Sequence, residues 1–131
     1  MGLDVIGQPL MLADGTRLPL SKAIRAGDFV FLSGQLGFGA DARIVSGGIE
    51  AQTRQCLENI KAVLAEAGAE LADVVRANIW LTDASEFGAF NAVYAEYFAQ
   101  TPPARSAVCS ALMLPEAKVE IEVTAFRPQP D

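Results

Sequence analysis

The sequence predicts an α+β domain in which a mixed sheet of about six strands carries two helices on one face. Three observations lead to this prediction. Two segments with helical periodicity, 49–68 and 85–99, alternate with strand-like segments. The last strand-like segment, 118–126, alternates apolar and polar residues without a break. The length of 131 residues is that of one domain, so we expect residues 1–131 to fold as a single unit.

The first third of the chain predicts short strands joined by loops. Residues 1–15 carry little pattern, so we expect an irregular or weakly ordered N-terminal segment with at most a short, frayed strand. Residues 18–26 predict a strand that Pro19 interrupts, as happens at sheet edges. The continuous apolar run 29–32, which precedes Ser-Gly-Gln, predicts a strand that is buried on both faces.

The two predicted helices differ in their apolar faces. In the first, apolar residues recur at helical spacing, and Gly68 is expected to end the helix. Candidate caps at 82–85 precede the second helix, and Thr-Pro-Pro at 101–103 stops it. Residues 73–81, between the two helices, predict a strand rich in β-branched residues. The second helix is expected to pack six side chains inward: Phe87, Phe90, Val93, Tyr94, Tyr97 and Phe98.

The segment from 103 to 126 holds the charged residues of greatest interest. It predicts two strands, 105–112 and 118–126, joined by a short proline-marked turn into a hairpin-like unit. Arg105 begins the first strand, and two carboxylates, Glu120 and Glu122, share one face of the second. A guanidinium and a carboxylate are the groups needed to hold a small anion and to activate a water molecule.

Composition restricts the class of protein. Hydrophobic residues make up 51% of the chain and the mean hydropathy is +0.26, so we expect part of the apolar surface to be covered by another subunit, sheet against sheet. The net charge of −6 argues against broad binding of nucleic acid. The two cysteines, Cys56 and Cys109, have no metal or redox spacing and are expected to be reduced, buried thiols.

The chain contains no histidine, which excludes Ser-His-Asp and Cys-His mechanisms and the usual zinc sites. A metal site made only of carboxylates stays possible, but no ligand cluster points to one, so we expect neither a metal nor a cofactor. No apolar run reaches the length of a membrane span, and the N-terminus does not resemble a signal peptide. We therefore expect a cytoplasmic location and no membrane partner.

Each candidate site residue has an alternative structural explanation. Arg105 is either a two-point binder of a carboxylate or an ion-pair partner of Glu120 or Glu122. The two glutamates are either a general base with a neighbour or the exposed face of a strand. Ser33 and Asn91 provide either hydrogen bonds to a ligand or local capping and solvation. Spacing alone favours the structural explanation for each.

Together, these stretches resemble the YjgF/RidA family of reactive-intermediate deaminases, formerly called endoribonuclease L-PSP. The resemblance covers nearly all of 18–128, through FVFLSGQ at 29–35, QTRQCLENIKAVLAEAG at 52–68, and the segments 73–83 and 87–98. The most specific part is the closing PPARSAV…LP…VEIEVTAF.

The resemblance implies a chorismate-mutase-like fold and a homotrimer with a barrel-like core and sites between subunits. The implied activity is hydrolysis of 2-enamine and 2-imine intermediates to 2-keto acids and ammonia. Arg105 would hold the substrate carboxylate and Glu120 would position or activate water, while Ser33 and Asn91 fall at family site positions. No cofactor is implied, because a protonated imine is already electrophilic.

Two positions depart from the family pattern. Leu20 stands where an aromatic residue is common, and Ala107 where a cysteine is common, with Cys109 two residues further on. These changes lie at the implied pocket and leave the substrate range open. The alternatives to a deaminase are a non-catalytic trimer that binds small carboxylates or acts as a holdase, and a ribonuclease, which the acidic charge and the missing histidine disfavour.

Overall fold

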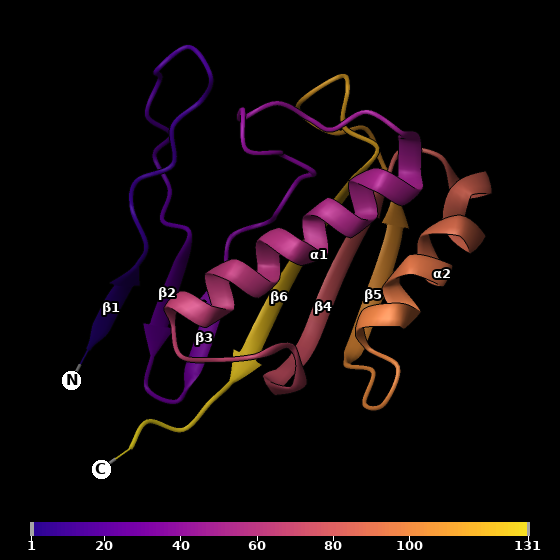
Figure 1. Ribbon diagram of the computed structural model, residues 1–131. Helices are drawn as coiled ribbons and strands as arrows, with labels where there is room; N and C mark the ends of the chain where they lie inside the picture. Colours follow the sequence, from indigo (N-terminus) through magenta and orange to yellow (C-terminus); the bar gives the residue numbers. More distant parts are fainter. Residues whose placement is uncertain (1, 131) are drawn as a thin grey trace.

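The computed structural model describes residues 2–130, which form one six-stranded sheet with two α-helices on one side (Figure 1). The strands lie in the order β1-β2-β3-β6-β4-β5. All neighbouring pairs are antiparallel except β4 and β5, which are parallel, so the sheet is mixed as predicted. The elements are β1 Leu3–Ile6, β2 Ala23–Ala26, β3 Phe29–Leu32, α1 Gly48–Glu66, β4 Val74–Leu81, α2 Phe87–Tyr97, β5 Ala104–Cys109 and β6 Val119–Phe126, with 3-10 helices η1 Leu71–Asp73 and η2 Ala84–Glu86.

The last two strands, β5 and β6, do not form a hairpin, and the expectation of a hairpin-like unit is wrong. β4 lies between them, paired in parallel with β5 and antiparallel to β6. The reason is the crossover through α2, which returns the chain parallel to β4 and leaves β5 at the edge of the sheet. The connection 110–118 then passes the end of β4 before β6 begins.

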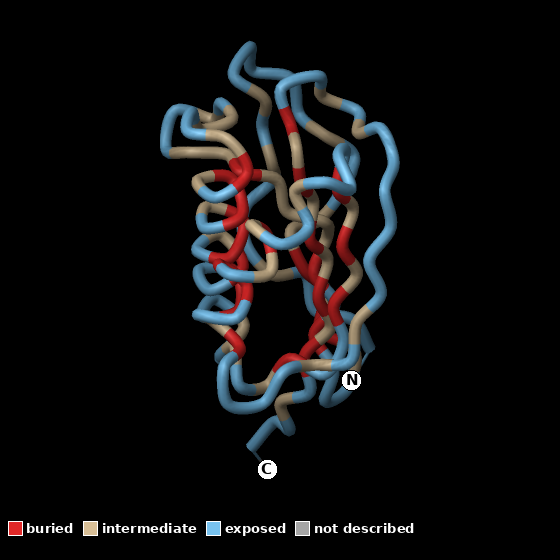
Figure 2. The backbone as a smooth tube through the Cα atoms, turned by 90° about the vertical axis from the view of Figure 1, so that its right-hand side faces the viewer, coloured by how far each residue is buried: buried red, intermediate tan, exposed pale blue. Residues whose placement is uncertain are grey.

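The core lies between the helices and one face of the sheet. In the edge-on view, the buried residues of the two layers face each other, while the outer sides of the helices are exposed (Figure 2). Along β6, buried and half-buried residues alternate from Val119 to Ala125, as the sequence pattern predicts. The largest fully buried side chains include Phe90, Leu57, Ile60, Leu64, Ile79 and Ile121.

The other face of the sheet carries no helix. In β3, Val30 and Leu32 are buried against the helices, but Phe29 and Phe31 are 41% and 47% exposed. Phe126 of β6 is also exposed, and its ring packs edge-on against Phe29 with 5.1 Å between centroids. The expectation that residues 29–32 are buried on both faces is therefore wrong within one chain. Below we call this side the open face of the sheet.

The N-terminal third is less regular than predicted. The strand expected over 18–26 starts only at Ala23, and Pro19 lies in the loop that precedes it. Proline has no amide hydrogen to contribute to a ladder, which explains why pairing begins beyond it. The short strand β1, Leu3–Ile6, pairs with β2 at the sheet edge.

The end of α1 has the predicted glycine. Gly68 adopts a φ of 76°, a left-handed conformation that an L residue rarely takes, and the amide of Ala69 donates to Leu64 O over 2.8 Å. The buried Arg25 adds a donor, with Nη2 2.7 Å from Ala67 O. These contacts satisfy carbonyls at the helix end and hold it against β2.

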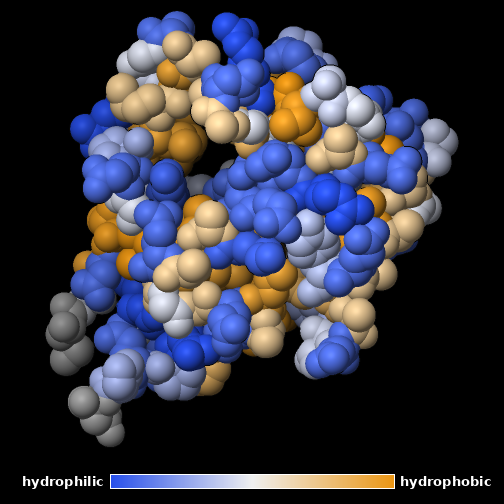
Figure 3. Space-filling model, in the orientation of Figure 1, coloured by the Kyte–Doolittle hydropathy of each residue, from blue (hydrophilic) through white to orange (hydrophobic). Residues whose placement is uncertain are grey.

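Hydrophilic side chains gather along the outer side of α1 in the space-filling view (Figure 3). Gln52 and Thr53, however, lie on its buried side among the apolar residues. None of the helices within residues 2–130 has the length and apolar character required to cross a membrane.

Candidate functional site

Arg105 lies on the edge strand β5 and points to the helix side of the sheet. Its register partner on β4 is Ala77, which is fully buried under the helices. From there the guanidinium reaches α2, where Nη2 donates to Oδ1 of Asn91 over 2.7 Å. Asn91 is therefore neither a cap nor merely solvated, because its side chain holds the guanidinium. The sequence-based alternative of an ion pair from Arg105 to Glu120 or Glu122 is not observed.

Three rings of α2 surround the same guanidinium; we call Phe87, Phe90 and Tyr94 the aromatic platform. The Cζ atom of Arg105 lies 5.4 Å, 5.8 Å and 4.8 Å from their respective ring centroids. A guanidinium within about 6 Å of a ring centroid is attracted by the π system. The platform and Asn91 therefore hold the same cation.

Tyr94 is a site residue that the sequence did not reveal. It is buried, and its hydroxyl has no hydrogen-bond partner among the described residues. Burial raises the pKa of Tyr94, an effect that the positive charge of Arg105 opposes. The sequence predicted only that the aromatic residues of α2 pack inward; Phe87 is instead 39% exposed. Phe87 and Tyr94 lie one helical turn before and one turn after Asn91 in the sequence. This spacing was the available signal that their rings lie on the same side of α2 as Asn91.

Two hollows flank Arg105. The first, the Arg105 hollow, measures about 400 Å³ and is lined by Arg105 itself together with Asn91, Tyr94 and Pro103. The second, the Ala107 hollow, measures about 150 Å³. Its lining consists of Leu81, Ala84, Phe87, Ala107, Val108 and Cys109. Arg105 and Asn91 thus border the first hollow, and no charged side chain borders the second.

Glu120 lies on the open face of the sheet. Its register partner on β4 is Trp80, and its neighbour on the same face, Glu122, accepts a hydrogen bond from Nδ2 of Asn78 over 2.9 Å. Partial burial raises the pKa of Glu120, and the negative charge of Glu122 raises it further. A carboxylate with a raised pKa is a stronger base than an exposed one.

The backbone at Gly34 lies against Glu120. Two backbone hydrogen bonds between Gln35 and Ile121 hold this segment to β6. A Cβ atom at Gly34 would overlap the Glu120 carboxylate, so only glycine permits this approach. The hydroxyl of Ser33 donates to Ser21 O over 2.6 Å, a local contact of the kind that the structural alternative anticipated.

Arg105 and Glu120 project from opposite faces of the sheet. Glu120 shares its face with Trp80 and, through the next register pair, with Val108. Arg105 is three residues from Val108 and therefore lies on the other face. Arg105 and Glu120 therefore do not meet within a single chain, because β4 separates the two strands and the pleat turns the side chains apart.

The two pocket positions that depart from the family pattern lie far apart in this chain. Leu20 is exposed in the loop before β2. Ala107 lies on β5, next along the strand on the face of Arg105, followed by Cys109. Cys109 is exposed, contrary to the expectation of a buried thiol, because β5 is the edge strand of the sheet and all its residues except Arg105 are exposed. Cys56 is buried as predicted, and burial raises the pKa of its thiol.

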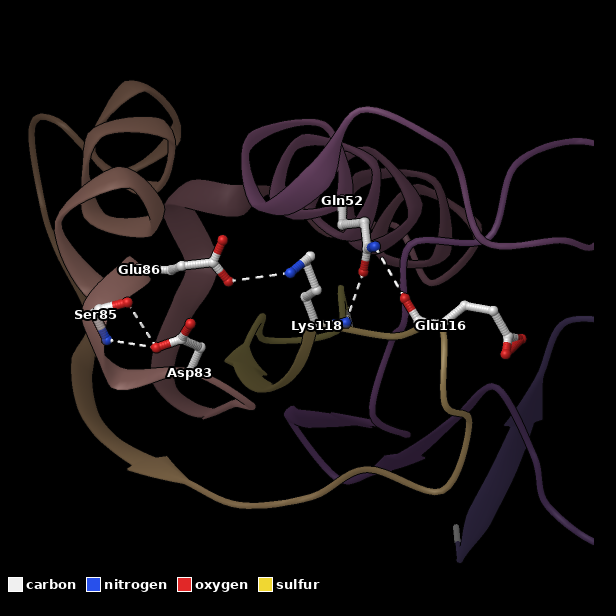
Figure 4. Close-up of polar contacts among 6 residues, drawn as sticks. All are labelled: Gln52, Asp83, Ser85, Glu86, Glu116 and Lys118. Atoms are coloured by element: carbon white, nitrogen blue, oxygen red, sulfur yellow. Dashed lines mark hydrogen bonds and ion pairs between the residues drawn. The ribbon is translucent and has the colours of Figure 1, made fainter.

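A polar network fixes the start of β6 (Figure 4). The buried amide of Gln52 on α1 accepts from the Lys118 backbone N–H over 2.8 Å and donates to Glu116 O over 3.1 Å. The Lys118 ammonium lies 3.4 Å from a carboxylate oxygen of Glu86, immediately before α2. The network therefore ties together the elements that carry Asn91 and Glu120. The periodicity of apolar residues did not identify Gln52, since it does not reveal a backbone partner.

Among residues 2–130, no group of three or more His, Cys, Asp or Glu side chains is arranged to hold a metal ion. The polar groups of the candidate site are the guanidinium of Arg105, the amide of Asn91 and the carboxylates of Glu120 and Glu122.

Comparison with known proteins places these features in a family. The family model described as Endoribonuclease L-PSP matches residues 13–127. A RutC family protein of Pyrococcus horikoshii is 44% identical over 110 residues, which are 83% of this chain and 87% of that protein. The chloroplastic Reactive Intermediate Deaminase A of Arabidopsis thaliana is 42% identical over 108 residues, covering 82% of this chain and 58% of that protein.

Solved structures share the fold. The crystal structure of E. coli TdcF with bound serine superposes with a TM-score of 0.83 at 30% identity, covering 95% of this chain and 98% of that one. The chain described here has the same six-stranded mixed sheet with two helices, and its sequence matches the family model over 13–127. The chain therefore belongs to the YjgF/Rid family, whose family model is described as Endoribonuclease L-PSP.

Proposed function

We propose that this protein hydrolyses reactive 2-imino and 2-enamino acids to 2-keto acids and ammonia without a cofactor. The observation that carries the proposal is the guanidinium of Arg105, held by Asn91 and the aromatic platform at the mouth of a hollow. Such a fixed, planar cation suits a small carboxylate. The relative named Reactive Intermediate Deaminase A supports the reaction class.

In this proposal, Arg105 binds the substrate carboxylate through two parallel N–H donors. Among the described residues, its side chain makes one hydrogen bond, to Asn91, so further donors are available to a ligand. Holding the carboxylate places the adjacent C=N carbon at a defined distance from the base and the water. Leu20, Ala107 and Ser33 would contact the substrate as well, as the family resemblance implies.

Glu120 is the proposed base. It takes a proton from a water molecule whose oxygen adds to the carbon of the protonated imine, giving a neutral carbinolamine. The proton then passes from Glu120 to the amine nitrogen. The C–N bond breaks as the hydroxyl becomes the carbonyl, and the hydroxyl proton leaves with the nitrogen. The net reaction converts one iminium and one water into one keto acid and one ammonium ion.

Because Arg105 and Glu120 lie on opposite faces, the proposed site combines two copies of the chain. On the open face, the exposed rings of Phe29, Phe31 and Phe126 provide a surface on which copies associate. We propose a homotrimer whose sites lie between neighbouring subunits, in which Arg105 of one copy faces Glu120 of the next. The family relationship supports this assembly, and the cytoplasmic location stays a prediction of the sequence.

A relative's ligand gives further support. The E. coli TdcF structure holds serine, a small molecule with an amino group next to a carboxylate. A 2-imino acid has the same carboxylate next to a nitrogen-bearing carbon. The same fact is compatible with the alternative of a non-catalytic trimer that binds small carboxylates.

Three alternatives to a deaminase are a binding protein, a holdase and a ribonuclease. A binding protein needs Arg105 but tolerates Glu120→Gln, whereas a holdase tolerates the loss of either side chain. A ribonuclease, suggested by the family description, is disfavoured by the net charge of −6 and the absence of histidine.

The test measures the release of ammonia and keto acid from imines that an amino-acid oxidase generates in place, with semicarbazide trapping whatever imine remains. We expect the wild-type protein to lower the trapped imine well below the spontaneous level. We expect Arg105→Ala and Glu120→Gln to abolish this effect. If the wild-type protein clears none of the imines faster than the spontaneous rate, the proposal that it is an imine hydrolase is rejected, and the non-catalytic binding protein becomes the preferred explanation.

A further inference from the structure

We propose that the Ala107 hollow receives the side chain of the substrate, so that the protein favours imino acids with branched aliphatic or aromatic side chains. This inference rests on the proposed imine hydrolysis and adds a substrate class to it. The observation that carries it is the position of an apolar hollow next to the proposed carboxylate-binding residue, on the same face of β5.

The hollow has the chemistry of an apolar subsite. Its six lining residues contribute hydrocarbon atoms and one thiol, and no charged side chain. Its volume is about 150 Å³, which is large enough for a benzene-sized group. An isobutyl or benzyl group would fill it, whereas a methyl group would leave most of it empty. Burial of the larger groups is favourable by area.

The hollow also lies within reach of the carboxylate site. Arg105 and Ala107 are two residues apart on one strand face, which corresponds to about 6.6 Å. Phe87 links the two features: its ring centroid is 5.4 Å from Cζ of Arg105, and the same ring lines the hollow. Four carbon–carbon bonds of about 1.5 Å join the carboxylate carbon of a leucine-type imino acid to its terminal methyl groups, a span of about 5 Å to which the size of the methyl group adds.

The two hollows differ in the charged and amide side chains that line them. The Arg105 hollow is lined by the guanidinium and by the amide of Asn91, so it suits the carboxylate and the polar end. The Ala107 hollow offers no such partner and suits a hydrocarbon group. A small residue at 107 is necessary for this division, because a larger side chain there would fill the hollow from β5.

The experiment compares imines that an amino-acid oxidase generates from alanine and from leucine, with catalase present to remove peroxide. For the wild type, we expect kcat/KM to be about tenfold or more higher for the leucine-derived imine. Ala107→Leu should bring this ratio close to one, because it lowers kcat/KM for the leucine-derived imine more than kcat/KM for the alanine-derived imine. Cys109→Phe, which fills the hollow from the next position, provides a second variant should the first fail to fold.

The matched control is Ala65→Leu, the same added volume at an exposed position of α1, which should leave the ratio unchanged. Ala95→Leu fills the Arg105 hollow instead. If that variant, and not Ala107→Leu, removes the preference for leucine, the side chain binds in the other hollow and the inference is wrong. Equal rates for both imines in the wild type would also overturn it, while leaving imine hydrolysis intact.

A binding measurement separates this inference from the proposed function. Calorimetry with 4-methyl-2-oxopentanoate and with pyruvate does not depend on catalysis. We expect the branched keto acid to bind about tenfold more tightly and Ala107→Leu to remove the difference. If the wild type clears no imine yet shows this difference, the proposed function fails and the apolar subsite stands. Equal affinities, or no binding of either acid, would contradict the subsite.

Discussion

The Oδ1 atom of Asn91 accepts a hydrogen bond of 2.7 Å from Nη2 of Arg105, and this contact joins α2 to the edge strand β5. Asn91→Ala removes the acceptor, and we expect KM to rise by about tenfold with a smaller change in kcat. Arg105→Lys should lose more, about a hundredfold in kcat/KM, because an ammonium cannot stack on the aromatic platform or bind a carboxylate at two points. Steady-state kinetics at several substrate concentrations separates the two effects. Equal values for Asn91→Ala and the wild type would show that the contact does not position Arg105.

The raised pKa of Glu120 predicts opposite effects of pH on activity and stability. A base must be ionised, so kcat/KM should fall as the pH drops through the pKa of Glu120, above the usual value of 4.5. Because the folded pKa lies above the unfolded one, folding takes up a proton. The contribution of this group to stability is therefore present below pH 4.5 and is lost as the pH rises through the folded pKa.

Glu120→Gln tests the stability effect, since it keeps the shape of the side chain and removes its charge. We expect a higher Tm than the wild type at pH 7 and no difference at pH 4, where the wild-type carboxyl is also neutral. Thermal unfolding followed by circular dichroism at both pH values measures the difference. A lower Tm at pH 7 would mean that the ionised Glu120 has a stabilising partner in the assembled protein.

Gly34→Ala should disturb Glu120 directly. The added methyl group overlaps the carboxylate, so the side chain must move, and we expect kcat to fall at least about tenfold. Gly88→Ala in α2 is the matched control, since a Cβ there meets no atom within 4 Å and alanine favours a helix by about 0.5–1 kcal/mol. Full activity in Gly34→Ala would show that the position of this carboxylate is unimportant.

The network around Gln52 predicts a contrast in stability. Gln52→Ala leaves the Lys118 amide and the Glu116 carbonyl without their partners, which should cost about 1–3 kcal/mol of unfolding free energy. Lys118→Ala keeps those backbone contacts and removes only a partly exposed ion pair to Glu86, worth about 0–1 kcal/mol. Urea unfolding of both variants measures the difference. If Gln52→Ala and Lys118→Ala lose the same unfolding free energy, the ion pair stabilises the protein as much as the Gln52 contacts do, and the predicted contrast is wrong.

The fold was largely predictable because local patterns determine it. The alternation of 119–126 specifies a half-buried strand, and the apolar stripe and Gly68 specify α1 and its end. The pairing of β5 was not predictable from local pattern, since nothing in residues 104–109 indicates that β4 lies between them and β6. The burial of Phe29 and Phe31 was overestimated, because an apolar run does not show whether a helix or another subunit covers its second face.

The candidate site was predictable as a set of residues but not as an arrangement. Arg105 and Asn91 do meet, across 14 positions of sequence. Tyr94 and Gln52 were missed, because an inward-facing aromatic residue and a polar residue on a helix look structural until their partners are known. The separation of Arg105 and Glu120 onto opposite faces follows from register through β4, which the sequence does not encode locally.

The most direct test of the two-copy site is complementation between inactive chains. Arg105→Ala and Glu120→Gln proteins are mixed in equal amounts, unfolded, refolded together and assayed for imine hydrolysis, with each variant and the wild type refolded alone as controls. If Arg105 of one subunit works with Glu120 of its neighbour, about one quarter of the sites in randomly mixed rings receive both intact residues. We therefore predict about a quarter of the refolded wild-type activity. Activity no greater than that of the two variants alone would contradict a site shared between subunits.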